Sequence, residues 1–257
     1  MSDTVVVDVT GPVGRVALDN PARLNAVDAP MLDALAEAVR ALDARPDVRV
    51  VVLAGAGRGF CSGADLRAGG ADGGKVDDST LYAAGAAVRA IVASQTPVVA
   101  VVGGVAAGVG CSIALAADYV LAGESASFVL AFGRIGLMPD GGATALVAAA
   151  VGRARALRMA LSTEAVGGVD AAAWGLVAEC VPDDRLQSRA EELCGFLAAL
   201  APGATAATLT AVNAAALDLD SALAREEEGQ SALLRTADAR EGVAAFTEKR
   251  RPHFGGA

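Results

Sequence analysis

Apolar positions along this chain alternate between the spacing of a strand and the spacing of a helix. Residues 98–102 form a continuous apolar run of strand length, and residues 4–9, 14–18 and 48–53 are stretches of similar length rich in valine and other apolar residues. Residues 30–44 instead repeat apolar side chains every three to four positions, which is typical of a helix with one buried face. We therefore expect strands and helices to follow one another from the start of the chain.

The second half of the chain continues this order and then becomes mostly helical. A helix is expected at residues 81–93, and short strands are expected at 119–121, at 127–130 and near 176–181. Because strands and helices alternate until the last of these strands, the order predicts a largely parallel α/β core with helices added at the end.

Composition narrows the class of protein. A chain of 257 residues, 54% of them hydrophobic, is long enough to bury a large core as one α/β domain or as a core with a smaller appendage. The formal net charge of −9 argues against nucleic acid as a partner, because phosphate binding needs a basic surface.

The cysteines and the termini bear on the cellular compartment. The four cysteines show no CxxC spacing, and the N-terminus lacks the basic and apolar regions of a signal peptide, so we expect reduced thiols in a cytoplasmic protein. No charge occurs between Arg89 and Asp118, a length that suggests a membrane span. Pro97 and several glycines break this stretch into strand and turn, so no membrane contact is expected.

Residues 97–142 combine a buried strand, a glycine-rich turn and an isolated carboxylate. The backbone can turn and approach a ligand closely at Gly103, Gly104, Gly108 and Gly110. A helix expected to begin near Gly110 would point free N–H groups into the turn, where they can stabilise negative charge developing on an oxygen. Asp140 is the only carboxylate between Glu124 and Glu164 and is the candidate acid or base. The combination indicates chemistry on an activated carbonyl, but Asp140 alone could equally be a turn or helix-cap residue.

Two other short motifs in the sequence resemble functional motifs but lack a residue that the function needs. Residues 69–75 fit the GxxxxGK pattern of a phosphate-binding loop, but Val76 stands where a hydroxyl should hold magnesium. Cys61 lies in a Gly-x-Cys-x-Gly sequence like that of a nucleophile elbow, but the only histidine, His253, is near the C-terminus. Neither a catalytic triad nor a histidine-based metal site is therefore expected.

Several long motifs occur in a fixed order along nearly the whole chain. They are Arg23-Leu24-Asn25-Ala26, GRGFCSGADL at 57–66, PVVAVVGGVAAGVGCSIALAADYVLA at 97–122, IGLMPDGGAT at 135–144, AAWGLVAECV at 172–181 and REGVAAFTEKRRPHF at 240–254. With these motifs the chain resembles the crotonase superfamily, also called the enoyl-CoA hydratase/isomerase family.

The resemblance implies a crotonase-like spiral of ββα units that binds acyl-CoA thioesters. Residues 1–200 would form the core with the acyl-CoA site, and residues 201–257 would form a helical region for oligomerisation and CoA contact. A homotrimer or a dimer of trimers is expected. No cofactor or metal is implied, because coenzyme A is part of the substrate.

The resemblance also assigns site residues. The two backbone amides of the family's oxyanion hole map onto Ala64 and Val109, where many members have glycine at the second position. The residues implied to contact CoA are Ser62, Asp65, Leu66, Arg67, Phe246 and Lys249. The residues implied to line the acyl pocket are Ser112, Phe132 and Met138.

The chain departs from the family pattern at the two glutamates that hydratases use. Ser112 and Phe132 stand at those positions, and neither side chain can transfer the proton that hydration requires. Asp140 matches the catalytic aspartate of dienoyl-CoA isomerases and of ring 1,2-epoxyphenylacetyl-CoA isomerases. The resemblance therefore predicts an enoyl-CoA isomerase with one acid/base, whose basicity apolar neighbours would raise. The alternatives are a hydratase or hydrolase with an atypical site, and a non-catalytic acyl-CoA-binding subunit.

Overall fold

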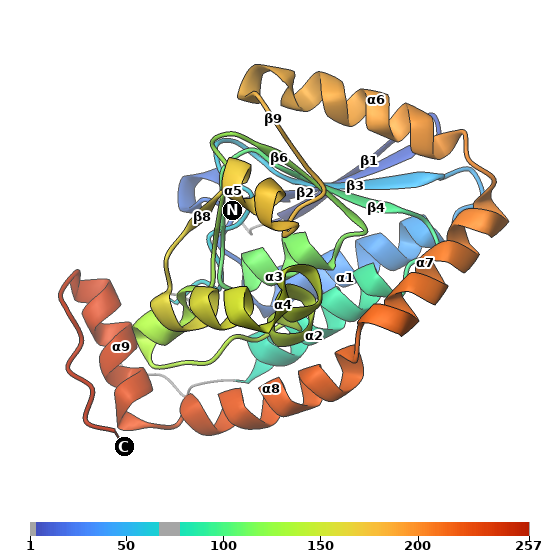
Figure 1. Ribbon diagram of the computed structural model, residues 1–257. Coiled ribbons are helices and arrows are strands. Elements are labelled where there is room, and N and C mark those ends of the chain that lie inside the picture. Colours follow the sequence, from blue (N-terminus) through green and yellow to red (C-terminus); the bar gives the residue numbers. More distant parts are fainter. Residues whose placement is uncertain (1–3, 67–77, 257) are drawn as a thin grey trace.

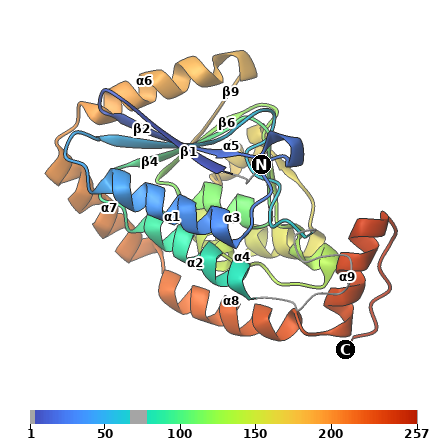
Figure 2. The same cartoon turned by 180° about the vertical axis from the view of Figure 1, so that it is seen from behind.

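The computed structural model describes residues 4–66 and 78–256, and within them the strands form two sheets (Figures 1 and 2). The larger sheet contains, in spatial order, β1 (Thr4–Thr10), β2 (Val13–Asp19), β3 (Val50–Gly55), β4 (Val98–Val102), β6 (Tyr119–Gly123) and β9 (Glu179–Val181). Its first pair, β1 and β2, is antiparallel, and the later pairs are parallel. The largely parallel core expected from the order of elements is confirmed.

Two of the three strands of the smaller sheet follow directly after strands of the larger one. The smaller sheet contains β5 (Val105–Ala107), β7 (Ser127–Val129) and β8 (Val166–Gly167), with β5 parallel to β7 and β7 antiparallel to β8. Strand β4 is followed directly by β5, and β6 by β7, so each of these units sends one strand to each sheet. This is the expected arrangement of ββα units.

Helices cover both faces of the larger sheet, and further helices follow in the C-terminal part of the chain. They are α1 (Ala29–Asp43), α2 (Ser79–Val92), α3 (Val109–Ala116), α4 (Ala143–Ser162), α5 (Gly168–Trp174), α6 (Leu186–Ala198), α7 (Pro202–Ala216), α8 (Leu219–Leu233) and α9 (Ala237–Glu248). Figure 1 shows α6 on one side of the sheet and α1, α2, α3 and α4 on the other. Helix α8, the last but one, packs against α2 and α4, which brings the C-terminal part of the chain back onto the core.

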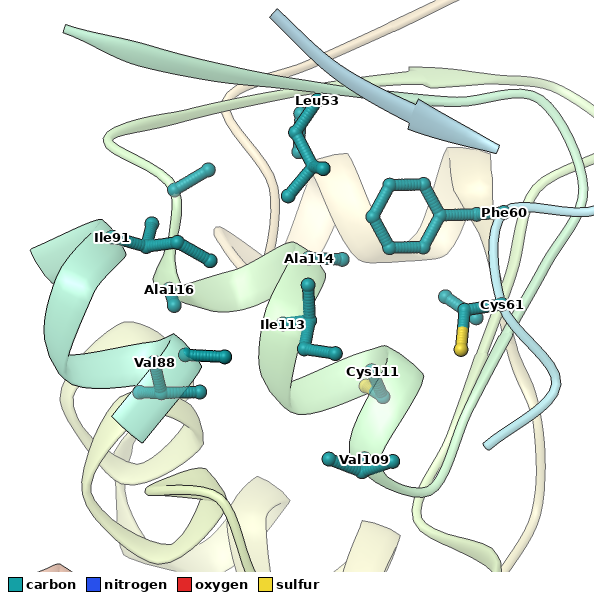
Figure 3. Close-up of a cluster of buried hydrophobic side chains, with 14 of the residues drawn as sticks. Leu53, Phe60, Cys61, Val88, Ile91, Val109, Cys111, Ile113, Ala114 and Ala116 are labelled. Atoms are coloured by element: carbon teal, nitrogen blue, oxygen red, sulfur yellow. The ribbon is translucent and has the colours of Figure 1, made fainter. Parts of the chain in front are cut away.

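Apolar side chains fill both sides of the larger sheet. Val50 and Val52 of β3 pack toward Leu193 and Cys194 of α6. The intervening residues Val51 and Leu53 belong to the main core, which contains α1, α2 and α3 (Figure 3). This alternation is the side-chain pattern of a strand covered on both faces.

The short helix α3 lies inside the main core. A Cβ atom on Gly110 would lie 2.5 Å from the carbonyl oxygen of Cys61, so only glycine lets the first turn of α3 approach that segment. Figure 3 shows Ile113 between the sheet and α2, near Ile91 and Val88. The N-terminus of α3 is therefore fixed by packing on several sides.

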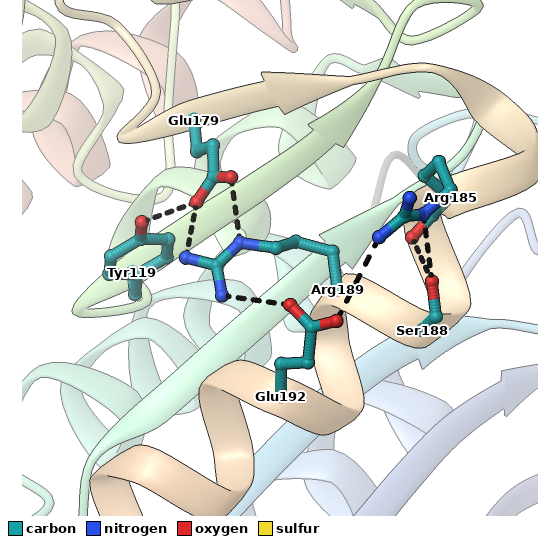
Figure 4. Close-up of polar contacts among 6 residues, drawn as sticks. All are labelled: Tyr119, Glu179, Arg185, Ser188, Arg189 and Glu192. Carbon is teal, nitrogen blue, oxygen red and sulfur yellow. Dashed lines mark hydrogen bonds and ion pairs between the residues drawn. The ribbon is translucent and has the colours of Figure 1, made fainter.

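A polar network holds α6 on the other side of the sheet (Figure 4). The guanidinium of Arg189 donates to both carboxylate oxygens of Glu179, over 2.8 and 3.0 Å, and the hydroxyl of Tyr119 donates to Glu179 over 2.8 Å. The hydrogen bonds from Arg189 hold the pKa of Glu179 below its ordinary value. These contacts join α6 to the neighbouring strands β6 and β9.

Most elements expected from the sequence are confirmed with small shifts of their ends. Helix 30–44 is α1, strand 48–53 is β3 and helix 81–93 is α2. The strand expected near 176–181 is limited to Glu179–Val181, and the two-residue strand β8 was not expected. The loop-like sequence at 69–75 lies outside the described residues.

No single helix of the described chain is both long enough and apolar enough to cross a membrane. The segments Asp183–Ala198 and Pro202–Ala216 meet the length and composition test only as a pair, and that pair is bent by 107°.

Asn25 in the Arg23-Leu24-Asn25-Ala26 motif fixes the loop after β3. Its side chain is fully buried, and its Nδ2 donates to the carbonyls of Ala56 and Gly59 over 2.9 and 2.8 Å. Its Oδ1 accepts from the backbone N–H of Asn20 over 2.9 Å. Its backbone has φ 55°, a left-handed conformation that asparagine tolerates better than most residues.

We expect Asn25→Ala to lower the free energy of unfolding by about 2–4 kcal/mol, because it leaves buried backbone groups without partners and strains the left-handed backbone. Urea unfolding measures the change. The control Gln187→Ala removes an exposed side chain on α6 and should cost less than about 0.5 kcal/mol. Equal effects of the two substitutions would contradict this role of Asn25.

Candidate active site

The loop after β3 pairs on one side with β5. The N–H of Cys61 donates to Val105 over 3.0 Å, and the N–H of Ala107 donates to Cys61 over 2.9 Å. A Cβ atom on Gly63 would lie 3.0 Å from the carbonyl oxygen of Ala107, and Gly63 has φ 103°. Glycine is required here because the two segments almost touch.

The other side of the same loop pairs with residues 24–27, and this pairing orients Ala64. Val27 donates to Gly63 over 2.9 Å and accepts from Asp65 over 2.8 Å, which makes a parallel bridge between Val27 and Ala64. In such a bridge the N–H of the opposite residue points away from its partner. The Ala64 N–H therefore faces the side on which Cys61 meets β5.

A second backbone donor lies at the start of α3. Gly108 precedes the helix with φ 53° and ψ −129°, a conformation essentially restricted to glycine, and Val109 is the first helical residue. The N–H of a first helical residue has no acceptor within its helix. Within residues 4–66 and 78–256, no hydrogen bond from the N–H of Ala64 or of Val109 to a protein atom occurs.

Helix α3 also holds the segment that carries Asp140. The hydroxyl of Ser112, one turn after Val109, donates to the carbonyl of Asp140 over 2.7 Å. Residues three apart lie on the same face of a helix. The side chain of Val109 lies 3.5 Å from the position that a Cβ on Gly141 would occupy. Val109 and Asp140 are thus brought together by one turn of α3.

Two successive glycines shape the turn after Asp140. Gly141 and Gly142 have φ values of 62° and 78°. A Cβ on Gly141 would lie 3.1 Å from the Cβ of Ser112, and one on Gly142 would lie 2.8 Å from a methyl carbon of Leu219. Both the backbone conformation and the lack of space require glycine, so the turn has one permitted shape.

The carboxyl group of Asp140 is buried, and no cation of the described residues pairs with it. The residue is 8% exposed, and its Oδ2 accepts a hydrogen bond from Nε2 of Gln230 over 2.9 Å. Its Oδ1 is buried and has no hydrogen-bond partner in the described structure. Burial raises the pKa of Asp140 to about 7; the hydrogen bond from Gln230 opposes this rise and the charge of Glu226 adds to it.

Two residues of α8 complete this environment, and the sequence analysis missed both. Glu226 is 1% exposed and accepts from the N–H groups of Gly142 and Thr144 over 2.6 and 2.8 Å, and also from the Thr144 hydroxyl. Burial raises the pKa of Glu226 as well. Gln230, one turn later, accepts from the N–H of Met138 over 3.0 Å.

A sequence signal for these residues exists, although it is weak. Glu226 and Gln230 share a helical face with Ala222 and Leu223, which are buried. The acidic run Glu226-Glu227-Glu228 hides this face because such a run is ordinarily solvated. The helix-cap alternative for Asp140 is wrong, since its side chain caps no helix and Glu226 bonds the first N–H groups of α4 instead.

The residues expected around the acyl group lie close to this segment. Ser112 is fully buried and uses its hydroxyl on the Asp140 backbone. The ring of Phe132 lies 3.8 Å from the position of a Cβ on Gly108, beside the start of α3. Met138 is half-buried, and its sulfur lies against Gly229 of α8.

The residues expected to contact CoA fall into two groups. The hydroxyl of Ser62 donates to the carbonyl of Arg23 over 2.9 Å, Asp65 forms an ion pair with the Arg23 side chain, and Leu66 is half-buried. Arg67 lies outside the described residues. The other group is exposed at the end of the chain: Phe246 lies on α9, and Lys249 is the residue that follows this helix. Helix α9 packs against Ala131–Ile135. Among the described residues, no ion pair or hydrogen bond joins these two groups.

Two of the four cysteines, Cys61 and Cys111, are unsuited to act as nucleophiles in this arrangement. Cys61 and Cys111 are completely buried, and burial raises the pKa of each thiol to about 12. Both remain thiols near neutral pH, whereas the thiolate is the reactive form.

Comparison with known proteins agrees with this geometry. The sequence pattern of the enoyl-CoA hydratase/isomerase family matches residues 8–257. A probable enoyl-CoA hydratase from Rhodobacter capsulatus is 41% identical over 98% of both chains, and the 1,2-epoxyphenylacetyl-CoA isomerase of Escherichia coli is 36% identical over 100% of both. The crystal structure of an enoyl-CoA hydratase from Mycobacterium avium subsp. paratuberculosis superposes with a TM-score of 0.91 and 46% identity, covering 97% of this chain and 98% of that one.

The chain therefore belongs to the enoyl-CoA hydratase/isomerase family and has its crotonase fold of ββα units followed by helices. It is an acyl-CoA enzyme of that family. Relatives named hydratase and isomerase are both similar over its whole length.

The raised pKa of Asp140 predicts a specific dependence of stability on pH. Because the native state binds this proton more tightly than the unfolded chain, unfolding free energy falls as pH rises from the ordinary value of 3.8 through about 7. Asp140→Asn removes this loss. The unfolding free energy of the variant relative to that of the parent protein should therefore rise by a few kcal/mol from pH 5.5 to pH 8. Urea unfolding at the two pH values measures this change.

Asp33→Asn on α1 is the matched control, because Asp33 is exposed and its substitution should change the unfolding free energy little at either pH. A difference between Asp140→Asn and parent that stays constant over this range would contradict the raised pKa.

Proposed function

We propose that this protein is an enoyl-CoA isomerase that moves a carbon–carbon double bond, with Asp140 as both base and acid. The observation that carries the proposal is the buried Asp140 carboxyl, which has one oxygen without a hydrogen-bond partner beside the start of α3. Ser112 and Phe132, at the positions of the hydratase glutamates, supply no second acid or base.

In this mechanism the thioester carbonyl oxygen accepts hydrogen bonds from the N–H groups of Ala64 and Val109. These donors stabilise the negative charge that develops when the neighbouring carbon loses a proton. Starting from a 3-enoyl-CoA, Asp140 removes a proton from C2 and the electron pair delocalises over the carbonyl oxygen and C4. The same carboxylic acid returns the proton to C4, which gives the 2-enoyl-CoA without a net change in atoms.

The environment of Asp140 suits a single group that performs both transfers. A pKa of about 7 leaves a useful fraction of the carboxylate present near neutral pH, and the protonated form is then acidic enough to return the proton. An ordinary exposed aspartate would be ionised but too weak a base. Burial of the carboxyl therefore supports the isomerase proposal.

Hydration of a 2-enoyl-CoA is the second candidate function. It is favoured by the 41% identity to a protein named a probable enoyl-CoA hydratase. Water addition needs one group to orient and deprotonate water and a proton donor for the carbon. Asp140 would have to do both, since Ser112 uses its hydroxyl on the backbone and Phe132 is apolar.

We further propose that the chain works in the cytoplasm as a homotrimer or a dimer of trimers, in which Phe246 and Lys249 contribute to CoA binding. Large apolar side chains left exposed on one chain support the assembly, among them Leu161, Phe196 and Val212. The four free cysteines support a reducing compartment. Light scattering of the purified protein should give three or six times the mass of one chain, and a monomer would contradict this assembly.

Purified protein should convert 3-hexenoyl-CoA into 2-hexenoyl-CoA, seen as the gain in absorbance of a conjugated thioester, and should add little water to 2-hexenoyl-CoA. Asp140→Asn should lower kcat roughly 10²- to 10⁴-fold because it removes the proton-transfer group. Asp33→Asn, on the surface of α1, should leave kcat unchanged.

Three results separate the candidates. Hydration of 2-hexenoyl-CoA without isomerisation would select the hydratase. Isomerisation that Asp140→Asn leaves intact would remove Asp140 from the mechanism. Tight binding of acyl-CoA with no turnover of either substrate would select a binding subunit.

A further inference from the structure

Helix α8 places two polar side chains in the protein interior, one turn apart, under the segment that carries Asp140. Glu226 and Gln230 are 1% and 2% exposed, although three of the other residues on this helix are acidic and exposed or half-buried. Together the two side chains form five hydrogen bonds with residues 138–144. Burial of polar groups is costly unless they are fully bonded, so this arrangement demands an explanation.

We infer that Gln230 and Glu226 are positioning residues that select Oδ1 of Asp140 as the proton-transferring atom and set the pH at which it works. The inference rests on the isomerase function proposed above. It extends that proposal by assigning roles to two residues of α8, of which Gln230 lies 90 positions from Asp140 in the sequence.

The hydrogen bonds of Gln230 fix the direction in which its amide points. The N–H of Met138 can only donate, so it requires the carbonyl oxygen of Gln230 on that side. The amide nitrogen must then face Asp140, where it donates to Oδ2 over 2.9 Å. With Oδ2 engaged, Oδ1 is the oxygen available to take and return a proton.

Glu226 supplies the negative charge near Asp140. Every group that contacts its carboxylate is a donor: two backbone N–H groups and the hydroxyl of Thr144. These donors at the start of α4 suit an ionised carboxylate. Asp140 receives a single amide donor, so Asp140 is the member of this acidic pair that takes up a proton first.

Among the described residues, no cation compensates the charge at Asp140. Helix α3 has no charged residue, and α4 has none before Arg153. The charged groups of the remaining described neighbours that form contacts form them elsewhere: Arg89 with Asp220 and Glu227, Arg225 with Asp218, Arg235 with Asp78, Arg134 with Thr163, and Asp238 with the N–H groups of Gly255 and Gly256. Glu228 of α8 is exposed. The acid/base behaviour of Asp140 is therefore controlled mainly from α8.

Two substitutions separate the two roles by opposite effects. Glu226→Gln keeps one acceptor oxygen, enough for the Thr144 donors, loses the acceptor for the Gly142 N–H and removes the charge. Because the charge is lost, the acidic limb of the kcat/KM profile should move to lower pH by roughly half a unit to one unit. Gln230→Met removes the donor to Oδ2, so that limb should move to higher pH. Its kcat near neutral pH should fall about tenfold or more, with a smaller change in KM, because the lost bond is to a charged group.

Gln230→Glu provides a second test if Gln230→Met folds poorly. It keeps the acceptor for the Met138 N–H and places a carboxylate against Oδ2, so the limb should move further upward. Glu228→Gln, an exposed position on α8, is the matched control and should leave the profile in place.

The pH dependence of unfolding gives a readout that needs no turnover. Because the pKa of Glu226 is raised as well, each protein is compared with its own Asp140→Asn form, which isolates the contribution of Asp140 to the unfolding free energy. The pH at which that contribution stops falling marks the native pKa of Asp140, so it should move down in Glu226→Gln and up in the Gln230 variants. Unmoved unfolding curves and an unmoved acidic limb in both variants, or a change in KM alone, would overturn the positioning role. Moved unfolding curves in a protein without isomerase turnover would uphold the positioning role and overturn the proposed function.

Discussion

The burial of a carboxyl group that has no cationic partner among the described residues is the constraint on which the candidate site depends. Asp140 loses most of its hydration and gains a single amide hydrogen bond in return. An ion pair would stabilise the carboxylate and leave it a weak base, whereas burial beside Glu226 keeps it close to protonation. Burying this carboxyl group costs free energy of folding, and the buried position persists because other contacts fix the surrounding turn.

Those contacts come from elements that are distant in sequence. Helix α3 provides Ser112, which bonds the Asp140 backbone, and Val109, whose N–H is free at the start of the helix. The approach of α3 to the loop after β3 depends on Gly110, and the permitted shape of the turn depends on Gly141 and Gly142. Helix α8 then closes the arrangement, so the C-terminal helices serve the site of their own chain as well as any assembly.

The sequence was sufficient to predict the elements whose pattern is local. The apolar runs of β3 and β4 and the amphipathic face of α1 give strands and a helix with ends shifted by one or two residues. Asp140 was a candidate because it is isolated between glycines and because its motif resembles that of known isomerases. Glu226 and Gln230 were missed because their position under Asp140 arises from a fold that brings α8 onto the turn. The weak signal of the face that they share with Ala222 and Leu223 is hidden by the acidic run of the helix. The two-residue strand β8 is likewise too short to leave a periodic signal.

The pKa of Asp140 itself tests this account most directly. Carbon-13 NMR of protein labelled at the aspartate carboxyl carbon follows each group as pH changes, and the Asp140 signal is identified by its absence from Asp140→Asn. The account predicts a midpoint near the value of about 7 given by its burial. A midpoint close to the ordinary value of 3.8 would show that the carboxyl is well solvated and would contradict the account.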